Sequence, residues 1–308
     1  MTDISSPSKP SLLNWLEVVA LGIIWGGSFL SVRIALDGMQ PLWIATGRIA
    51  LAALTLGALS MAMGLRLPPL AERKVWLHAL GFAVFSNALP FTLIAWAQTH
   101  VQSSFVGITM ALVPLFTLVL AHGFLPGERL TLSRMAGVAL GLVGVVVLIG
   151  VGALDMGNNA LDMVARIACI GVTLSYSVGS IITRRSPRVD PIAFSTAALI
   201  LAGMIMVPLT FAVEGGLPPM PPLRSALALV YLGLMPTALA TLIMVHVIRS
   251  AGPTFLTQTN YQVPVWSVLF GVLVLSEPLP PQFLAALGLI LTGLAVSRVS
   301  WRRRRAPV

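Results

Sequence analysis

The sequence contains few charged residues and almost no cysteine. Only 9% of its 308 residues are Asp, Glu, Lys or Arg, and Cys169 is the single cysteine. One cysteine excludes an intrachain disulfide, a zinc–thiolate cluster and an iron–sulfur site. Because Cys169 lies in an apolar run, we expect it to be a small packing residue. With 57% hydrophobic residues and a mean hydropathy of +0.93, the chain has more apolar surface than a soluble domain buries.

Groups that carry chemistry are scarce as well. The sequence has no His-Glu-x-x-His motif, and its four histidines fall in separate segments: His78, His100, His122 and His246. An enzyme within the membrane requires a nucleophile with a base, or clustered metal ligands. The sequence therefore argues against an enzyme, and it predicts neither a metal site nor a cofactor.

Long apolar runs are abundant. A membrane-spanning helix needs about 20 mainly apolar residues. That rule predicts ten spans, at 14–36, 42–64, 75–97, 103–123, 131–150, 163–184, 192–213, 224–247, 254–275 and 281–299. Residues 1–13 are expected to form a disordered arm and residues 300–308 a basic tail. The predicted fold class is thus an all-α integral membrane protein of ten transmembrane helices, surrounded by the lipid bilayer.

The basic residues are distributed unevenly between the two sides of these spans. A net charge of +9 would suggest nucleic-acid binding in a soluble protein, but here it is explained by topology. If the N-terminus is cytoplasmic, all but four of the 19 basic residues lie on the cytoplasmic side; the exceptions are Arg33, Arg48, Arg166 and Arg224. This bias predicts a bacterial-type inner-membrane protein with both termini in the cytoplasm and no nucleic-acid partner.

The two halves of the chain resemble each other. The same residue types recur about 150 residues apart: Phe105 with Phe255, Pro114 with Pro264, Glu128 with Glu277, and Gly144 with Gly293. This period is too long for a solenoid repeat and indicates a duplicated half. Five spans in each half bring the second copy in from the opposite side. We therefore expect inverted repeats at 14–150 and 163–299 around a central cavity, an arrangement suited to alternating access.

Several motifs carry a resemblance to a known family. The motif Trp25-Gly26-Gly27-Ser28-Phe29, Arg48, and the proline-bearing helix followed by Gly127-Glu128-Arg129-Leu130 resemble the EamA-type repeat of the drug/metabolite transporter superfamily. The second half departs from this pattern, because Tyr176-Ser177-Val178-Gly179-Ser180 and Ser276-Glu277-Pro278 replace the motifs. The resemblance implies a ten-helix carrier with a central cavity, of a kind that exports amino acids (aromatic ones included), other metabolites or drugs. It leaves the subfamily open.

Polar and aromatic residues near the middle of the spans are the candidate binding groups. In lipid such groups are costly, and they tend to face a cavity or another helix. The predicted substrate-binding residues are Trp25, Ser28, Asn87, Tyr176, Thr259, Asn260, Tyr261 and Gln262. Three prolines are expected to bend helices or to act in gating: Pro90, Pro114 and Pro264. Interhelical hydrogen bonds and core packing remain an alternative explanation for the same residues.

The placement of the charges bears on mechanism. No carboxylate is expected at mid-membrane, so we predict a uniporter or exchanger without obligatory proton coupling. Arg33 and Arg48 are expected in the outer half of the membrane, reaching the interface or pairing with Asp37, with attraction of a substrate carboxylate as the alternative. We expect no lysine or arginine at mid-span. This disfavours a nucleotide-sugar or phosphate carrier, which needs fixed cations in its cavity.

The sequence as a whole favours an inner-membrane exporter of small metabolites, with amino acids as the preferred class. The alternatives are a proton-coupled drug or metabolite exporter of the same superfamily, a channel, or a receptor. Glycines of the fifth and tenth spans, such as Gly137 and Gly293, are typical of close helix packing or dimerisation, so the protein is expected to be a monomer or a homodimer.

Overall fold

A computed structural model describes residues 10–128, 130–150 and 160–298, and within these ranges every regular element is a helix. Most of the predicted N-terminal arm, the basic tail and Arg129 of the predicted turn lie outside the described residues. The helix that begins the first span starts within the predicted arm, at Leu12.

The helices follow the order of the predicted spans. The first half contains α1 (Leu12–Leu36), α2 (Pro41–Ala62), α3 (Arg73–Phe82), η1 (Ala83–Ala88), α4 (Leu89–Ala97), α5 (Ser103–Thr109), η2 (Met110–Leu112), α6 (Val113–Phe124) and α7 (Leu132–Ile149). The second half contains α8 (Ala160–Arg185), α9 (Pro191–Glu214), α10 (Leu223–Gly233), η4 (Leu234–Leu239), α11 (Ala240–Ala251), α12 (Pro253–Leu256), α13 (Thr259–Leu275) and α14 (Pro281–Arg298).

Local sequence explains where the helices begin. Ser11 and Asn14 form a reciprocal capping box at the start of α1. Pro41 and Pro191 occupy the first positions of α2 and α9, where the missing N–H costs nothing. Asp190 caps α9 by accepting hydrogen bonds from the first backbone amides of that helix.

Nine helical stretches in the described part of the chain are long and apolar enough to cross a membrane. The ninth predicted span, 254–275, is not one of them. It is divided into α12 and a 17-residue α13, so the prediction of a continuous helix there is wrong. Gly252, with a φ of 88°, directly precedes α12, and the break lies between Leu256 and Thr259. There the Thr257 hydroxyl donates to the Thr254 carbonyl. This local bond competes with helical pairing of the backbone.

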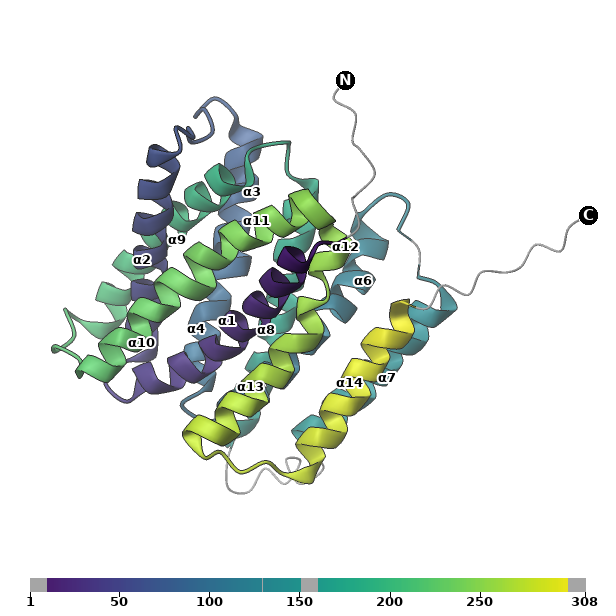
Figure 1. Ribbon diagram of the computed structural model, residues 1–308. Coiled ribbons are helices and arrows are strands. Elements are labelled where there is room, and N and C mark those ends of the chain that lie inside the picture. Colours follow the sequence, from purple (N-terminus) through teal and green to yellow (C-terminus); the bar gives the residue numbers. More distant parts are fainter. Residues whose placement is uncertain (1–9, 129, 151–159, 299–308) are drawn as a thin grey trace, which may run out of the picture.

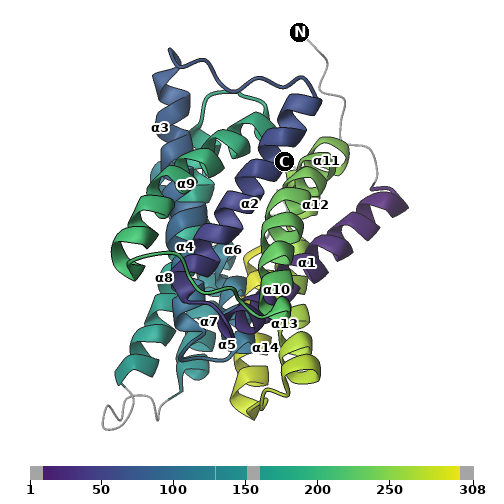
Figure 2. The same ribbon diagram turned by 90° about the vertical axis from the view of Figure 1, so that its left-hand side faces the viewer.

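The spans pack in pairs that relate the two halves. The pairs are α7 with α14, α2 with α9, α1 with α13, α6 with α8, α1 with α10, α4 with α8, α2 with α10, and α3 with α9. Exchanging the corresponding spans of the two halves converts these eight pairs into one another, whereas the weaker contacts of α14 with α5 and α6 have no comparable counterpart between α7 and α13 within the described residues. Figure 1 shows α7 and α14 side by side at one edge of the bundle, and Figure 2 faces the opposite edge, where α2, α9 and α10 lie.

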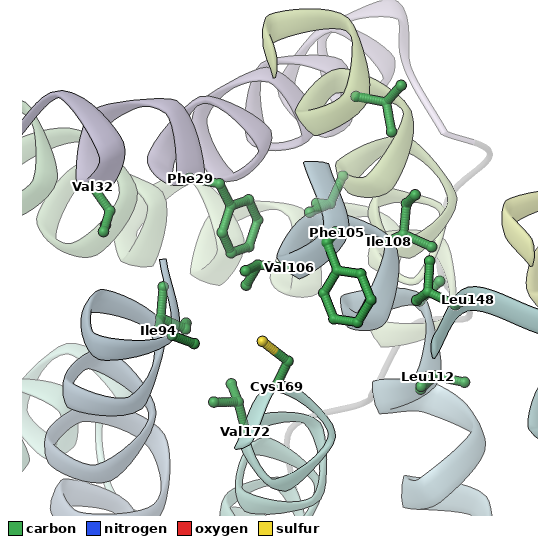
Figure 3. Close-up of a cluster of buried hydrophobic side chains, with 14 of the residues drawn as sticks. Phe29, Val32, Ile94, Phe105, Val106, Ile108, Leu112, Leu148, Cys169 and Val172 are labelled. Carbon is green, nitrogen blue, oxygen red and sulfur yellow. The ribbon is translucent and has the colours of Figure 1, made fainter. Parts of the chain in front are cut away.

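A large buried cluster joins the first, fourth, fifth and sixth spans. Phe29, Phe105 and Leu148 contribute to it from three different helices, as Figure 3 shows. Cys169 has no exposed surface and lies among these side chains, near Ile94 and Val172. The prediction that Cys169 is a small packing residue is therefore confirmed.

The α7–α14 pair depends on glycine at the contact. A Cβ added to Gly293 would lie 2.6 Å from the Gly137 carbonyl oxygen, and one added to Gly137 would lie 2.4 Å from the Gly293 oxygen. Both distances are too short for a carbon atom beside backbone that does not move aside. The two backbones therefore meet where any larger residue would separate them.

We expect Gly293→Ala to lower the free energy of unfolding by about 1–3 kcal/mol, because the added methyl forces the helices apart. The matched control is Gly288→Ala in the same helix, where an added Cβ meets nothing within 4 Å. Thermal unfolding in detergent can be followed with a thiol-reactive fluorophore, since Cys169 is buried until the bundle opens. Equal melting temperatures for the two variants would contradict the close packing.

Candidate functional site

Two spans contain a π-helical segment near their middle. The segments are η1 in the third span and η4 in the eighth, and they begin 151 residues apart, at Ala83 and Leu234. Pro90 follows η1 closely, and Pro236 lies within η4. Single π-helical turns are frequent at functional sites because they widen the helix and redirect its side chains.

Side chains satisfy the backbone carbonyls that these segments release. Pro236 has no N–H to bond the carbonyl four residues earlier, that of Leu232. The Thr237 hydroxyl donates to this Leu232 oxygen at 2.9 Å instead. In η1 the Asn87 side-chain amide donates to the carbonyl of Phe82, also five residues earlier, at 3.3 Å. In both π segments, therefore, a side chain donates a hydrogen bond to the backbone carbonyl five residues earlier.

Each π segment is also bonded to the first span of the other half. The Trp25 indole N–H in α1 donates to the Pro236 carbonyl at 3.1 Å. The Ser175 hydroxyl in α8 donates to the Phe85 carbonyl at 2.7 Å. Trp25 and Ser175 are 150 residues apart, so the two halves place a donor at the same position.

Arg48 lies against η4 and is only 7% exposed. Its Nε donates to the Thr237 hydroxyl oxygen at 3.0 Å, and its Cζ lies 3.6 Å from the centre of the Phe91 ring. Tyr176 and Tyr231 lie in the neighbourhood of the guanidinium. No carboxylate of the described residues lies within salt-bridge distance of it.

Two predictions about the arginines are therefore wrong. Arg48 neither reaches the interface nor pairs with Asp37. Its Nε bonds Thr237, which is the central residue of the 29-residue stretch Leu223–Ala251, so a cation does lie next to the middle of a span, where none was expected. Arg48 is the eighth residue of α2, about 10 Å from the helix start. Packing of α2 against η4 keeps its side chain inside the bundle. Arg33 is exposed as expected, but it donates to the Gln98 carbonyl rather than to Asp37.

Four of the predicted binding residues lie on α1, η1 and α8. Trp25 is partly buried beside η4, and the buried Ser28 donates to the Trp25 carbonyl at 2.6 Å. Asn87 is buried within η1. Tyr176 packs against two hydrophobic clusters and lies in the neighbourhood of Arg48. Trp25 thus lies at η4 and Asn87 within η1, while Tyr176 follows Ser175, which bonds η1.

The other four, Thr259 to Gln262, lie in the first turn of α13. The Tyr261 ring centre is 4.9 Å from Cζ of Arg298, the last residue of α14, which places this ring toward one end of the bundle. Gln262 packs closely against Gly22 of α1. Gly22 is the eleventh of the 25 residues of α1, so the end of this turn lies near the middle of the first span. The role of these four residues in binding remains a prediction.

The three predicted prolines occupy different settings. Pro90 is the second residue of α4 and Pro114 the second residue of α6, after a π segment and a 3-10 turn respectively. Pro264 lies inside α13. Their roles in gating remain a prediction.

A cavity of about 430 Å³ opens near one end of α3, α6 and α8. Its walls include His78, Leu120, Phe124, Ile182 and Arg185. None of the predicted substrate-binding residues lines it. The cavity lies toward the side that the ten-span assignment makes cytoplasmic.

The ion pairs of the described residues join positions that the ten-span assignment places on the same side. Arg249 with Asp190, at 3.1 Å, and Arg134 with Glu128, at 2.9 Å, lie on the side predicted to be cytoplasmic. The Glu17 carboxylate also meets His246 there. On the other side, Glu277 accepts hydrogen bonds from the backbone amides of Ser103 and Ser104. The orientation of the whole molecule remains a prediction.

Comparisons with known proteins agree with this architecture. The profile of the EamA-like transporter family matches residues 15–150 and 163–299. The uncharacterized inner membrane transporter YedA of Escherichia coli (strain K12) is 29% identical over 88% of this chain and 86% of that protein. A probable terminal-alkyne amino-acid exporter of Streptantibioticus cattleyicolor is 26% identical over 97% and 98% of the two chains.

Two further comparisons extend this list. An S-adenosylmethionine/S-adenosylhomocysteine transporter of Chlamydia trachomatis (serovar D) is 26% identical over 88% of this chain and 84% of that protein. A solved crystal structure superposes with a TM-score of 0.65, at 23% identity, over 93% of this chain and 97% of the other. This last likeness concerns the fold alone.

We expect Trp25→Phe to lower the free energy of unfolding by about 1–3 kcal/mol, because the Pro236 carbonyl loses its donor inside the bundle. Trp76→Phe is the matched control, since the Trp76 indole donates to the Pro69 carbonyl at the same 3.1 Å but on the exposed surface. It should change the free energy by less than about 0.5 kcal/mol. Thermal unfolding read at Cys169 measures both, and a Trp25→Phe protein as stable as the control would disprove the structural role of this bond.

Proposed function

Because the chain belongs to the EamA-like transporter family, we propose that it exports small metabolites, with amino acids as the favoured class, across the inner membrane by alternating access. The protein is a multi-pass membrane transporter, not an enzyme. The proposal concerns its substrate class, its direction and its mechanism. The distribution of basic residues supports a cytoplasmic position for both termini.

The substrate class is supported by relatives that span nearly the whole chain. One is named as a probable amino-acid exporter and another as a transporter of S-adenosylmethionine, itself an amino-acid derivative. At 26% identity the names do not pass directly to this chain. The aromatic and neutral polar side chains of Trp25, Asn87 and Tyr176 suit a zwitterion with an apolar side chain, aromatic amino acids included.

The observation that carries the mechanism is the matched pair of π segments. Each is bonded to the first span of the other half, through Trp25 in one case and Ser175 in the other. The helix pairings also persist when the halves are exchanged. Two halves related as inverted repeats can exchange conformations, which opens the centre to one side and then to the other. The π segments are the points at which the third and eighth spans would bend.

The predicted binding residues then divide by depth. Trp25, Ser28, Asn87 and Tyr176 would contact the substrate near the centre. Thr259, Asn260, Tyr261 and Gln262 lie in the first turn of α13, between Arg298 at the end of α14 and Gly22 of α1, and would contact it on the way in or out. The break before α13 makes this part of the bundle the more adaptable one.

A proton-coupled exporter of drugs or other metabolites is the second candidate, favoured by one specific contact. The Glu17 carboxylate and His246 join α1 to α11, and the Glu17 side chain is only 14% exposed. A carboxylate and an imidazole that hold two spans together are groups that exchange protons in coupled carriers. Uniport predicts transport that a pH gradient does not change, whereas proton coupling predicts transport that requires the gradient.

We expect saturable counterflow of labelled L-phenylalanine or other members of an amino-acid panel in proteoliposomes, at rates that an imposed pH gradient does not change. The physical reason is that none of the residues proposed to contact the substrate has a carboxylate or imidazole that could exchange a proton during transport. Accumulation that requires the gradient, and that is lost in His246→Gln, would replace uniport with proton coupling. Liposomes with Trp76→Phe protein serve as the control for a substitution outside the spans' interior. The absence of counterflow for every amino acid would refute this substrate class.

A further inference from the structure

Arg48 is a buried cation without a counter-ion. The ion pairs of the described residues do not include it, and the titratable side chains in its neighbourhood are two tyrosines, Tyr176 and Tyr231. Removing a guanidinium from water is costly unless a charge or several hydrogen bonds compensate. One hydrogen bond to Thr237 and the face of Phe91 compensate only in part. The site as built is electrostatically incomplete.

The guanidinium has unused donors. Its Nε is occupied by Thr237, while Nη1 and Nη2 donate no hydrogen bond within the described part of the chain. Neither of these two nitrogens is among the polar atoms that are fully enclosed without a partner. They therefore face remaining space. The Phe91 ring lies against the guanidinium carbon and offers no acceptor, so both terminal nitrogens remain able to bind a carboxylate through two parallel hydrogen bonds.

Tyr176 supplies a second free group. The hydroxyl of Tyr231 donates to the Ile24 carbonyl at 3.2 Å, so its proton is already used. The Tyr176 hydroxyl has no hydrogen-bond partner among the described residues and is likewise absent from the fully enclosed atoms. Of the two tyrosines in the neighbourhood of Arg48, only Tyr176 has a hydroxyl proton that no acceptor among the described residues uses.

The other half of the chain has no arginine at the corresponding position. Arg48 is the eighth residue of α2, which starts at Pro41, and Ala198 is the eighth residue of α9, which starts at Pro191. Ala198 is fully buried, so the same helix pairing is built around a methyl group in the other half. One half thus carries a costly cation where the other carries alanine. A binding role explains this difference, whereas helix packing does not.

We propose that Arg48, with Tyr176, binds a carboxylate of the transported molecule. This proposal rests on the proposed function in one respect, namely that the bound carboxylic acid is the transported substrate. A single cation matches one monovalent carboxylate, whereas a phosphate dianion calls for more than one. Phe91 and Tyr176 provide aromatic surface next to the bound group. The site therefore selects a carboxylic acid with an apolar body over its amide or amine.

The proposal is tested by the binding of 3-phenylpropionate and 3-phenylpropanamide, which differ only in the carboxylate, to purified protein in detergent. The readout is the shift in melting temperature followed at Cys169. We expect the acid, and not the amide, to stabilise the wild-type protein. Arg48→Gln should weaken binding of the acid by roughly 10- to 100-fold, the range for hydrogen bonds to a charged group. Arg48→Lys, which keeps the charge but loses the fork, should fall in between.

Arg33→Gln is the matched control, because it removes the same charge from an exposed position on α1 and should leave the preference for the acid unchanged. Equal binding of the acid by wild type and Arg48→Gln, or equal binding of acid and amide by wild type, would overturn the subsite. If Arg48→Gln does not fold, Arg48→Lys and Tyr176→Phe decide in its place, and an unchanged preference for the acid in both overturns it.

The counterflow assay separates this subsite from the wider proposal. If the acid binds through Arg48 but no amino acid is transported, the amino-acid function fails and the carboxylate subsite stands. If L-phenylalanine counterflow is saturable in the wild type and unaffected in Arg48→Gln, the function stands and the subsite is overturned. With both correct, Arg48→Gln should raise the half-saturating concentration of L-phenylalanine by the same roughly 10- to 100-fold.

Discussion

Satisfaction of backbone carbonyls in the absence of water is the constraint on which the rest of this structure depends. In a bilayer every unpaired backbone group is costly, so a helix departs from α geometry only where other groups replace the lost bonds. Both π segments meet this condition in the same way. A polar side chain bonds the carbonyl five residues earlier, and a donor from the first span of the other half bonds another carbonyl. The bonds from the first spans, donated by Trp25 and Ser175, join the two halves.

The position of Arg48 is a consequence of the same arrangement. Pro236 leaves the Leu232 carbonyl without its helical partner, and the Thr237 hydroxyl turns its proton toward that oxygen. The lone pairs of the Thr237 oxygen then accept the Arg48 Nε–H. A proline in one span therefore fixes the side chain of an arginine in another. Because the partner is a hydroxyl and not a carboxylate, the guanidinium keeps its charge uncompensated.

The two halves share a framework but differ at the places where chemistry is expected. Ala198 stands at the position that corresponds to Arg48, and α12 is a separate short helix where the first half has the seven-residue α5. The start of α5 is held by Glu277, which accepts hydrogen bonds from Ser103 and Ser104, whereas Pro253 at the start of α12 has no N–H to offer. The two halves thus have similar helix pairings, and differences at single positions give them different local hydrogen bonds and charges.

Hydropathy was sufficient to predict an all-helical membrane protein, nine of its spans and the buried setting of Cys169, and the resemblance of its motifs to a known repeat was sufficient to predict its family. These properties are local or additive along the chain, so they can be read without knowing which helices touch. The break before α13, the unpaired Arg48 and the bond from Trp25 to Pro236 were not predictable in this way. Each depends on which side chain faces which backbone group across helices distant in sequence. Packing of the helices against one another alone decides that.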